Sequence, residues 1–251
     1  MKSKKNHKRV SRLYVDSTLQ LGATLSLKDE AAHYLGRVLR LACDDEVILF
    51  NGLGGEYRTR IVAQTKKNLS LEILGFSALE RESPLQITLV QGIGRSEHMD
   101  VVMQKATELG VQYIVPLKAQ RSQRTDTKYL EKRQQHWQKI ITSACEQCGR
   151  NRLPVLHPAQ DLSHYLTAQS EQLGTKIVLS PTANITLSAL PAHIQHIVLL
   201  IGPEGGFSDI EIAAIEAAGY TGVHLGKRIL RTETAALSML AVCQSRWGDW
   251  G

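Results

Sequence analysis

The chain has 251 residues, of which 43% are apolar, and a formal net charge of +6 at pH 7. This length suffices for one large domain or two modest ones. No apolar run approaches the roughly 18 residues of a membrane-spanning helix, and no apolar segment follows the basic N-terminus. We therefore expect a cytoplasmic protein with neither a secretory signal nor a membrane partner.

Positive charge is concentrated at the N-terminus. Residues 1–12 hold six of the 30 basic residues and none of the 24 acidic ones, so the rest of the chain is formally neutral. The six are Lys2, Lys4, Lys5, Lys8, Arg9 and Arg12. A basic arm in front of a balanced body suggests a polyanionic partner, with a solubilising tail as the alternative.

The first 80 residues predict a small β-barrel domain of short strands and one helix. The helix is predicted over 28–40, with Ser26 and Asp29 as a capping pattern, and it would place Arg37 and Arg40 on one face. The strands are predicted at 12–15, 23–27, 46–50, 56–63 and 69–74.

A charged, proline-ended stretch at 80–84 marks the predicted boundary between domains 1–80 and 81–251. Beyond it, strands and helices alternate, which predicts a mostly parallel sheet covered by helices on both faces. Strands are predicted at 87–93, 111–117 and 176–179, and helices at 97–109, 128–148 and 162–173.

The stretch 197–246 dominates the C-terminal half. It predicts a buried strand at 197–201, a glycine loop at 202–206, a helix, a short strand at 222–225, a second loop at 226–231 and a last helix. Ser208 and Glu211 form a capping box for the first helix, Gly219 ends it, and Thr232 is the predicted cap of the second. Both loops would then lie at the sheet edge where α/β proteins bind ligands.

Several catalytic and metal-binding classes lack their motifs. The chain has no P-loop, no dinucleotide-binding GxGxxG and no GxSxG nucleophile elbow. Cys145 and Cys148 form a CxxC without a second ligand pair, which favours a buried helix face over a metal or redox site. We expect no metal and no disulfide: Cys43 and Cys243 are predicted as core residues, and His33, His98 and His136 as surface or boundary residues.

Five segments together resemble one family. Residues 198–208 (VLLIGPEGGFS) and 225–235 (LGKRILRTETA), with 33–40 (HYLGRVLR), 104–111 (QKATELGV) and 144–150 (ACEQCGR), resemble the RsmE family of the SPOUT superfamily. The resemblance covers nearly the whole chain, and the combination of segments is specific.

The resemblance implies a fold, a reaction and partners. It implies an α/β domain with a C-terminal trefoil knot, which is a rare topology, after an N-terminal PUA-like RNA-binding barrel. It also implies a homodimer that uses S-adenosylmethionine to methylate N3 of a uridine in 16S ribosomal RNA of the small subunit. The alternatives are a non-catalytic RNA-binding or ribosome-assembly protein, and the same chemistry on another RNA or on ribose O2′.

The two loops supply the predicted binding site for the methyl donor. An adenosine pocket needs apolar walls with a few backbone polar groups, and glycines let the ligand approach closely. Residues that fit are Ile201, Gly202, Gly205, Leu225, Ile229 and Leu230, and the resemblance adds Leu179, Pro203, Glu204 and Ala235. The alternative is that 202–206 is only a tight turn.

Arg231 and Glu204 are the predicted catalytic residues, and Arg231 comes first because a guanidinium can stabilise the uridine anion at its carbonyl oxygens. Glu204 or Glu233 would accept the proton or hold Arg231 or the donor's amino group. The alternative for Arg231 is a helix-start ion pair with Glu233. No histidine lies in a matched motif as an evident base.

Arginines are the predicted RNA contacts, since they bind phosphate bidentately and stack on bases. They are Arg9, Arg12, Arg37, Arg40 and Arg58 in the first domain, with Arg95 and Arg121 in the second. His98 stands where members of the resembled family tend to have lysine, so a phosphate contact there would be weaker and pH-dependent.

Overall fold

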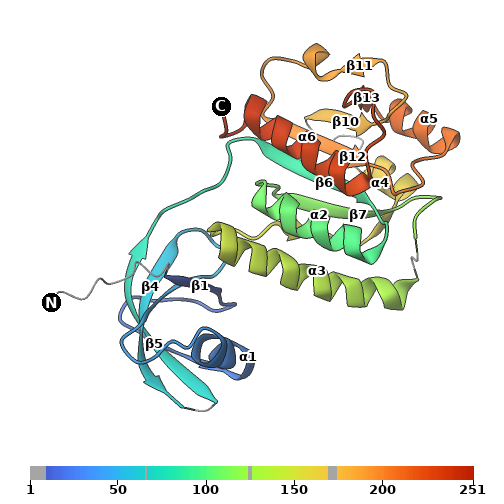
Figure 1. Ribbon diagram of the computed structural model, residues 1–251. Coiled ribbons are helices and arrows are strands. Elements are labelled where there is room, and N and C mark those ends of the chain that lie inside the picture. Colours follow the sequence, from blue (N-terminus) through green and yellow to red (C-terminus); the bar gives the residue numbers. More distant parts are fainter. Residues whose placement is uncertain (1–9, 66, 124–125, 169–173) are drawn as a thin grey trace. The chain divides into compact units, whose positions relative to one another are not determined.

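The computed structural model describes residues 10–65, 67–123, 126–168 and 174–251 (Figure 1). Arg9 and the rest of the predicted basic arm before it lie outside the described residues. The chain divides into two compact units, the first comprising Met1–Arg81 with Cys145–Arg152 and the second Glu82–Ala144 with Leu153–Gly251. None of the helices in the described ranges has the length and apolarity that a membrane crossing demands.

The first unit is built on a curled five-stranded sheet in the order β1-β3-β4-β5-β2. The strands are β1 (Ser11–Tyr14), β2 (Thr24–Lys28), β3 (Glu46–Phe50), β4 (Glu56–Gln64) and β5 (Asn68–Ser77). Its core is aliphatic and includes Leu35, Val47, Leu49, Ile61 and Leu71. Among the described residues β1 and β2 do not pair with each other, so the predicted closed barrel is instead a half-barrel.

The predicted helix over 28–40 is wrong in its bounds and its cap. β2 stays extended up to Lys28, which pairs with Asn68, so Ser26 lies in a strand and makes no cap. A short helix α1 (Asp29–His33) and a π-helical turn η1 (Tyr34–Val38) follow. Arg40 lies beyond η1 with φ 57°, so Arg37 and Arg40 do not share a helix face.

Arg12 is a structural residue of the first unit. Its side chain is only 8% exposed and forms an ion pair with Glu56. It also donates to Arg150 O at 3.2 Å and to Asn151 Oδ1 at 2.7 Å, and its guanidinium lies 4.9 Å from the centre of the Phe50 ring. These contacts occupy the guanidinium, and we withdraw Arg12 as an RNA contact.

The second unit is an eight-stranded sheet in which every pair is parallel, as predicted. Its order is β11-β13-β10-β12-β6-β7-β8, and β9 pairs with β7. The strands are β6 (Gln86–Gly92), β7 (Tyr113–Lys118), β8 (Val155–Leu156), β9 (Gln160–Asp161), β10 (Thr175–Leu179), β11 (Ile185–Thr186), β12 (His196–Ile201) and β13 (Thr221–His224). The two-residue strands β8, β9 and β11 are too short to leave a sequence pattern.

Helices cover both faces of this sheet. They are α2 (Ser96–Glu108), α3 (Thr127–Cys148), α4 (Leu162–Ala168), α5 (Asp209–Ala217), α6 (Thr232–Trp247) and a 3-10 turn, η2 (Leu187–Ala189). Leu89 and Leu199 pack with residues of α2, α3 and α6, whereas their neighbours Val90 and Leu200 pack with residues of α4 and α5. Figure 1 shows α2 and α6 side by side on the first of these faces.

The cap predictions for the two C-terminal helices had different outcomes. The capping box of α5 is confirmed, because the Ser208 side chain accepts from Glu211 N–H and the Glu211 side chain accepts from Ser208 N–H. Arg231, and not Thr232, is the N-terminal cap residue of α6, and Thr232 begins the helix. Cys43 is exposed, contrary to prediction, whereas Cys145 and Cys243 are buried, and all four cysteines are free.

Candidate active site

A cavity of about 710 Å³ lies in the second unit at the carboxyl edge of its parallel sheet. Its walls come from the segments that follow β6, β7, β10, β12 and β13, together with the start of α6. Because parallel strands end at one edge, loops distant in sequence converge there. The volume is in the range of small-molecule sites in proteins.

All ten residues predicted for donor binding line this cavity. They are Leu179, Ile201, Gly202, Pro203, Glu204, Gly205, Leu225, Ile229, Leu230 and Ala235. Arg95, Arg121 and Arg231 line it as well. The segment after β10, Ser180 to Thr182, also lines the cavity, as do Phe207 and His224, and none of these residues was predicted. The rule that parallel strands end together would have found the segment after β10, because its strand was predicted.

The loops that follow β6 and β12 pack backbone against backbone. A Cβ atom at Gly92 would lie 2.4 Å from the Pro203 nitrogen, and one at Gly94 would lie 2.4 Å from a carboxylate oxygen of Glu204. At Gly92 only glycine fits, because a Cβ would meet backbone atoms of the glycine loop, whereas at Gly94 the atoms it would meet belong to the Glu204 side chain. The loop at 202–206 therefore does more than reverse the chain, because it packs closely against the segment that follows β6.

Thr232 joins the two predicted loops. Its hydroxyl donates to Gly202 O at 2.6 Å and accepts from Gln91 Nε2 at 2.9 Å. Gln91 is fully buried near the end of β6, and its Nε2 also donates to Gly92 O at 3.1 Å. The hydroxyl thus ties the start of α6 to the ends of β6 and β12.

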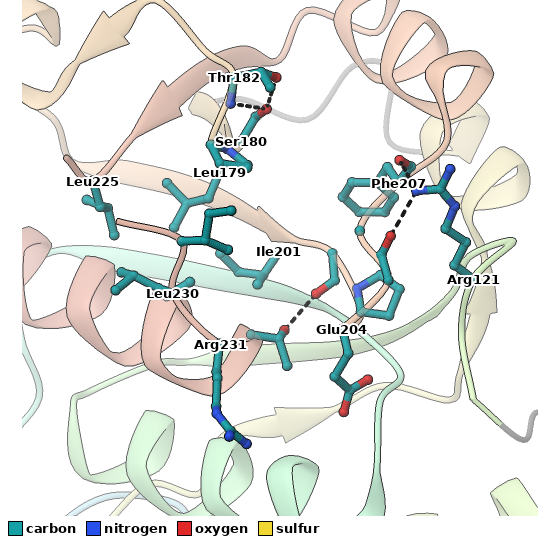
Figure 2. A pocket seen from close by; sticks show the side chains of 18 of the residues that line it. Arg121, Leu179, Ser180, Thr182, Ile201, Glu204, Phe207, Leu225, Leu230 and Arg231 are labelled. Carbon is teal, nitrogen blue, oxygen red and sulfur yellow. Dashed lines mark hydrogen bonds between the residues drawn. The ribbon is translucent and has the colours of Figure 1, made fainter. Parts of the chain in front are cut away.

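Arg121 holds the glycine loop from the other side. Its guanidinium donates to Gly205 O at 2.9 Å and to Phe207 O at 3.4 Å (Figure 2). The neighbouring Gln120 N–H donates to Glu211 Oε1 at 2.7 Å. Arg121, predicted as an RNA contact, therefore makes intramolecular hydrogen bonds that position the loop.

Glu204 faces His98 at the N-terminus of α2. Its Oε1 accepts from Arg95 N–H at 2.8 Å and lies 2.9 Å from His98 Nδ1. Burial alone would raise the pKa of Glu204, but the hydrogen bonds from Arg95 N–H and His98 lower it overall, so the carboxylate stays ionised. Glu233 Oε2 lies 3.6 Å from the same His98 Nδ1.

The predicted partners of Arg231 are wrong. Glu204 and Glu233 face His98, and within the described ranges the Arg231 guanidinium makes no ion pair or hydrogen bond. Arg231 is exposed at the cavity wall. Figure 2 shows Arg231 and Glu204 extending to the same side, away from Leu225 and Leu230.

The remaining predicted RNA contacts are exposed. Arg37, Arg40 and Arg58 lie on the surface of the first unit, and Arg95 is exposed at the start of α2. In the part of the chain that the structure describes, no three His, Cys, Asp or Glu residues gather as a metal site would require.

Comparison with known proteins defines the class first. Residues 81–244 match the RNA methyltransferase domain family, and residues 27–74 match the RNA methyltransferase PUA domain family. An α/β sheet with its cavity among glycine loops, joined to such a half-barrel, is the architecture of an RNA methyltransferase with a PUA domain.

The particular family follows from full-length relatives. The chain belongs to the ribosomal RNA small subunit methyltransferase E family. It is 36% identical over 243 residues to the member from Buchnera aphidicola of Schizaphis graminum, covering 96% of this chain and 98% of that one.

Two solved structures are similar to the chain over almost its whole length. The crystal structure of the family member from Neisseria gonorrhoeae, bound to S-adenosyl methionine, has a TM-score of 0.89 and 36% identity, covering 97% of this chain and 100% of that one. A Legionella pneumophila protein described as a methyltransferase, in complex with SAM, has a TM-score of 0.92 and 40% identity, covering 96% and 100%.

Proposed function

We propose that this protein transfers the methyl group of S-adenosylmethionine to N3 of a uridine in 16S ribosomal RNA of the small subunit. One observation carries the proposal: the residues predicted for the donor all line one cavity at the carboxyl edge of the sheet. The names of the full-length relatives support the RNA substrate, and the donor bound in two similar structures supports the cofactor.

The cavity residues fit the donor. Leu179, Ile201, Leu225 and Leu230 gather on one side of the cavity, as Figure 2 shows, and form an apolar slot for an adenine ring. Polar backbone of the loop at 202–206 borders the slot, as recognition of a base edge requires. When bound, S-adenosylmethionine supplies an electrophilic methyl group on its sulfonium sulfur.

We assign two tasks to the chain's own residues. The loops hold donor and uridine in line and in contact, which is the main requirement of a methyl transfer. Arg231 stabilises the negative charge that develops on the uridine carbonyl oxygens when N3 loses its proton. The Arg231 guanidinium is exposed and has no partner among the residues that the structure describes, so it is available for that contact.

We assign RNA binding mainly to residues 1–80 and catalysis to residues 81–251. Arg37, Arg40 and Arg58 are exposed and free to meet phosphate in the first unit, as is Arg95 in the second. Phosphate contacts of this kind make the affinity for RNA depend on salt concentration. In a plot of the logarithm of the binding constant against the logarithm of salt concentration, the steepness of the slope should fall by about one for each arginine removed.

The family resemblance also motivates two structural proposals. We infer a homodimer whose site is completed near the subunit interface, and a C-terminal segment threaded through a loop as a trefoil knot. Light scattering coupled to gel filtration tests the first, since a monomeric mass at assay concentration contradicts it. A chain traced in an experimental density map tests the second.

Nucleoside mass spectrometry of ribosomal RNA from a strain lacking this gene tests the reaction. We expect 3-methyluridine to disappear from the small-subunit RNA and to return with the wild-type gene. In a thermal-shift titration, S-adenosylmethionine should stabilise the protein by mass action. No shift would favour a non-catalytic RNA-binding protein, and loss of a different methylated nucleoside would reassign the acceptor.

A further inference from the structure

A histidine lies between two carboxylates in the wall of the cavity. His98 is in the first turn of α2, lines the cavity and has a side chain that is 17% exposed. Its Nδ1 lies 2.9 Å from Glu204 Oε1, in the glycine loop, and 3.6 Å from Glu233 Oε2, in α6. Three elements distant in sequence therefore converge on one imidazole nitrogen.

The carboxylates determine which nitrogen carries the proton. A carboxylate only accepts hydrogen bonds, so Nδ1 must be the donor and, in the neutral ring, Nε2 keeps a lone pair. Hydrogen bonds lower the pKa of Glu204, so it remains an acceptor near neutral pH. Glu233 Oε2 is buried and has no hydrogen-bond partner in the described ranges. Because it lies 3.6 Å from His98 Nδ1, this carboxylate also favours a proton on that nitrogen.

We propose that His98 is the general base that accepts the N3 proton of the uridine, through Nε2, with Glu204 as the residue that positions it. The proposal rests on the proposed function. The N3–H bond breaks as its proton moves to Nε2, and the N3 electron pair forms the bond to the methyl carbon. The electron pair of the broken carbon–sulfur bond goes to sulfur, giving S-adenosylhomocysteine.

The surroundings of His98 suit this role better than a phosphate contact. Two carboxylates at 2.9 and 3.6 Å repel a phosphate, whereas they stabilise the imidazolium that forms when Nε2 takes a proton. The other charged side chains that line the cavity are Arg95, Arg121, Asp209, Arg228 and Arg231. Arg231 can stabilise the uridine anion while His98 removes the proton.

His136 provides a matched control for substitutions. Its Nε2 lies 2.8 Å from Asp100 Oδ2, so it is also a histidine paired with a carboxylate. It is exposed on α3 and does not line the cavity. His136→Gln therefore controls for loss of a histidine–carboxylate pair outside the site.

The test is single-turnover formation of 3-methyluridine on unmodified small subunits, with donor and RNA affinities measured separately. His98→Gln should slow the step by at least about a hundredfold, as expected for a lost general base, with both affinities within about twofold of wild type. The acid limb of the wild-type pH–rate profile should be absent from this variant. His136→Gln should match wild type.

A second measurement does not depend on turnover. Nitrogen-15 NMR of the histidine side chains of the free protein should show the Nδ1–H tautomer for His98, and Glu204→Gln should weaken it. A His98→Gln protein within about threefold of wild type overturns the base, as does an Nε2–H tautomer in wild type. So does a His98→Lys protein with full activity at neutral pH. Wild-type protein that forms no 3-methyluridine instead overturns the proposed reaction.

Discussion

The hydroxyl of Thr232 offers a sharp test of how the cavity is held together. Thr232→Val keeps the shape of the side chain but removes the group that bonds Gly202 O and Gln91 Nε2. Gln91 is fully buried, and within the described ranges its Nε2 keeps only the bond to Gly92 O. The loss of its bond to Thr232 therefore costs about 1–2 kcal/mol. Gly202 is half-buried, so water replaces part of its lost bond, and its cost is about 0.5–1 kcal/mol.

These contributions add to about 2 kcal/mol of lost stability, or about 4–8 °C in Tm for a unit of this size. We expect the Kd for S-adenosylmethionine to rise about tenfold, because the loops at 202–206 and 226–231 lose their shared anchor. Thr232→Ser is the control, since it keeps the hydroxyl and loses one methyl group, worth about 0.8 kcal/mol. A Val variant with the same Tm and the same donor Kd as the Ser variant would show that the Thr232 hydroxyl does not hold the two loops together.

Further variants probe other contacts. Arg231→Ala should leave the donor Kd within a few-fold in calorimetry but remove methyl transfer, and wild-type turnover would refute its role. Arg121→Ala should raise the donor Kd about fivefold, about 1 kcal/mol for an exposed guanidinium that holds Gly205 O; an unchanged Kd would contradict this. Arg12→Ala should destabilise the first unit in urea by about 3 kcal/mol, and near-wild-type stability would count against the buried ion pair with Glu56.

The same ion pair predicts a pH dependence of stability. Burial raises the pKa of Glu56, but hydrogen bonds from Arg12 and Arg81 lower it below its ordinary value of 4.5. Because the pKa of Glu56 is lower in the folded than in the unfolded state, its ionised carboxylate stabilises the fold fully above pH 4.5. This stabilisation is lost as the pH falls through the pKa of the folded state. Urea midpoints should therefore decline below about pH 4.5, and less steeply in Arg12→Ala.

Patterns within a few residues predicted much of the fold. The capping box at Ser208 and Glu211 is a local exchange of hydrogen bonds, and the structure has it as predicted. The alternation of strands and helices after residue 81 likewise gave the parallel sheet. The helix over 28–40 failed because pairing between Lys28 and Asn68, which no local pattern encodes, keeps the chain extended.

Residue roles were harder to predict, because partners distant in sequence decide them. Arg12 resembled a basic surface residue, but Glu56 and Asn151 bind its guanidinium. Threonine is a common helix cap residue, yet the hydroxyl of Thr232 forms hydrogen bonds at the ends of β6 and β12. The residues predicted for the donor do line one cavity, but no pattern in the sequence indicated that His98 and Glu204 would meet.

The division of the chain into units has a consequence for its synthesis on the ribosome. Translation delivers the strands of the N-terminal half-barrel early, but this unit also includes residues 145–152, which are made only after β6 and β7 of the second unit. The pairing of β6 with β12 forms later still, because β12 and Thr232, which binds Gln91 of β6, are translated near the end of the chain. A nascent chain released before Thr232 therefore lacks the hydroxyl that ties the ends of β6 and β12 together at the cavity.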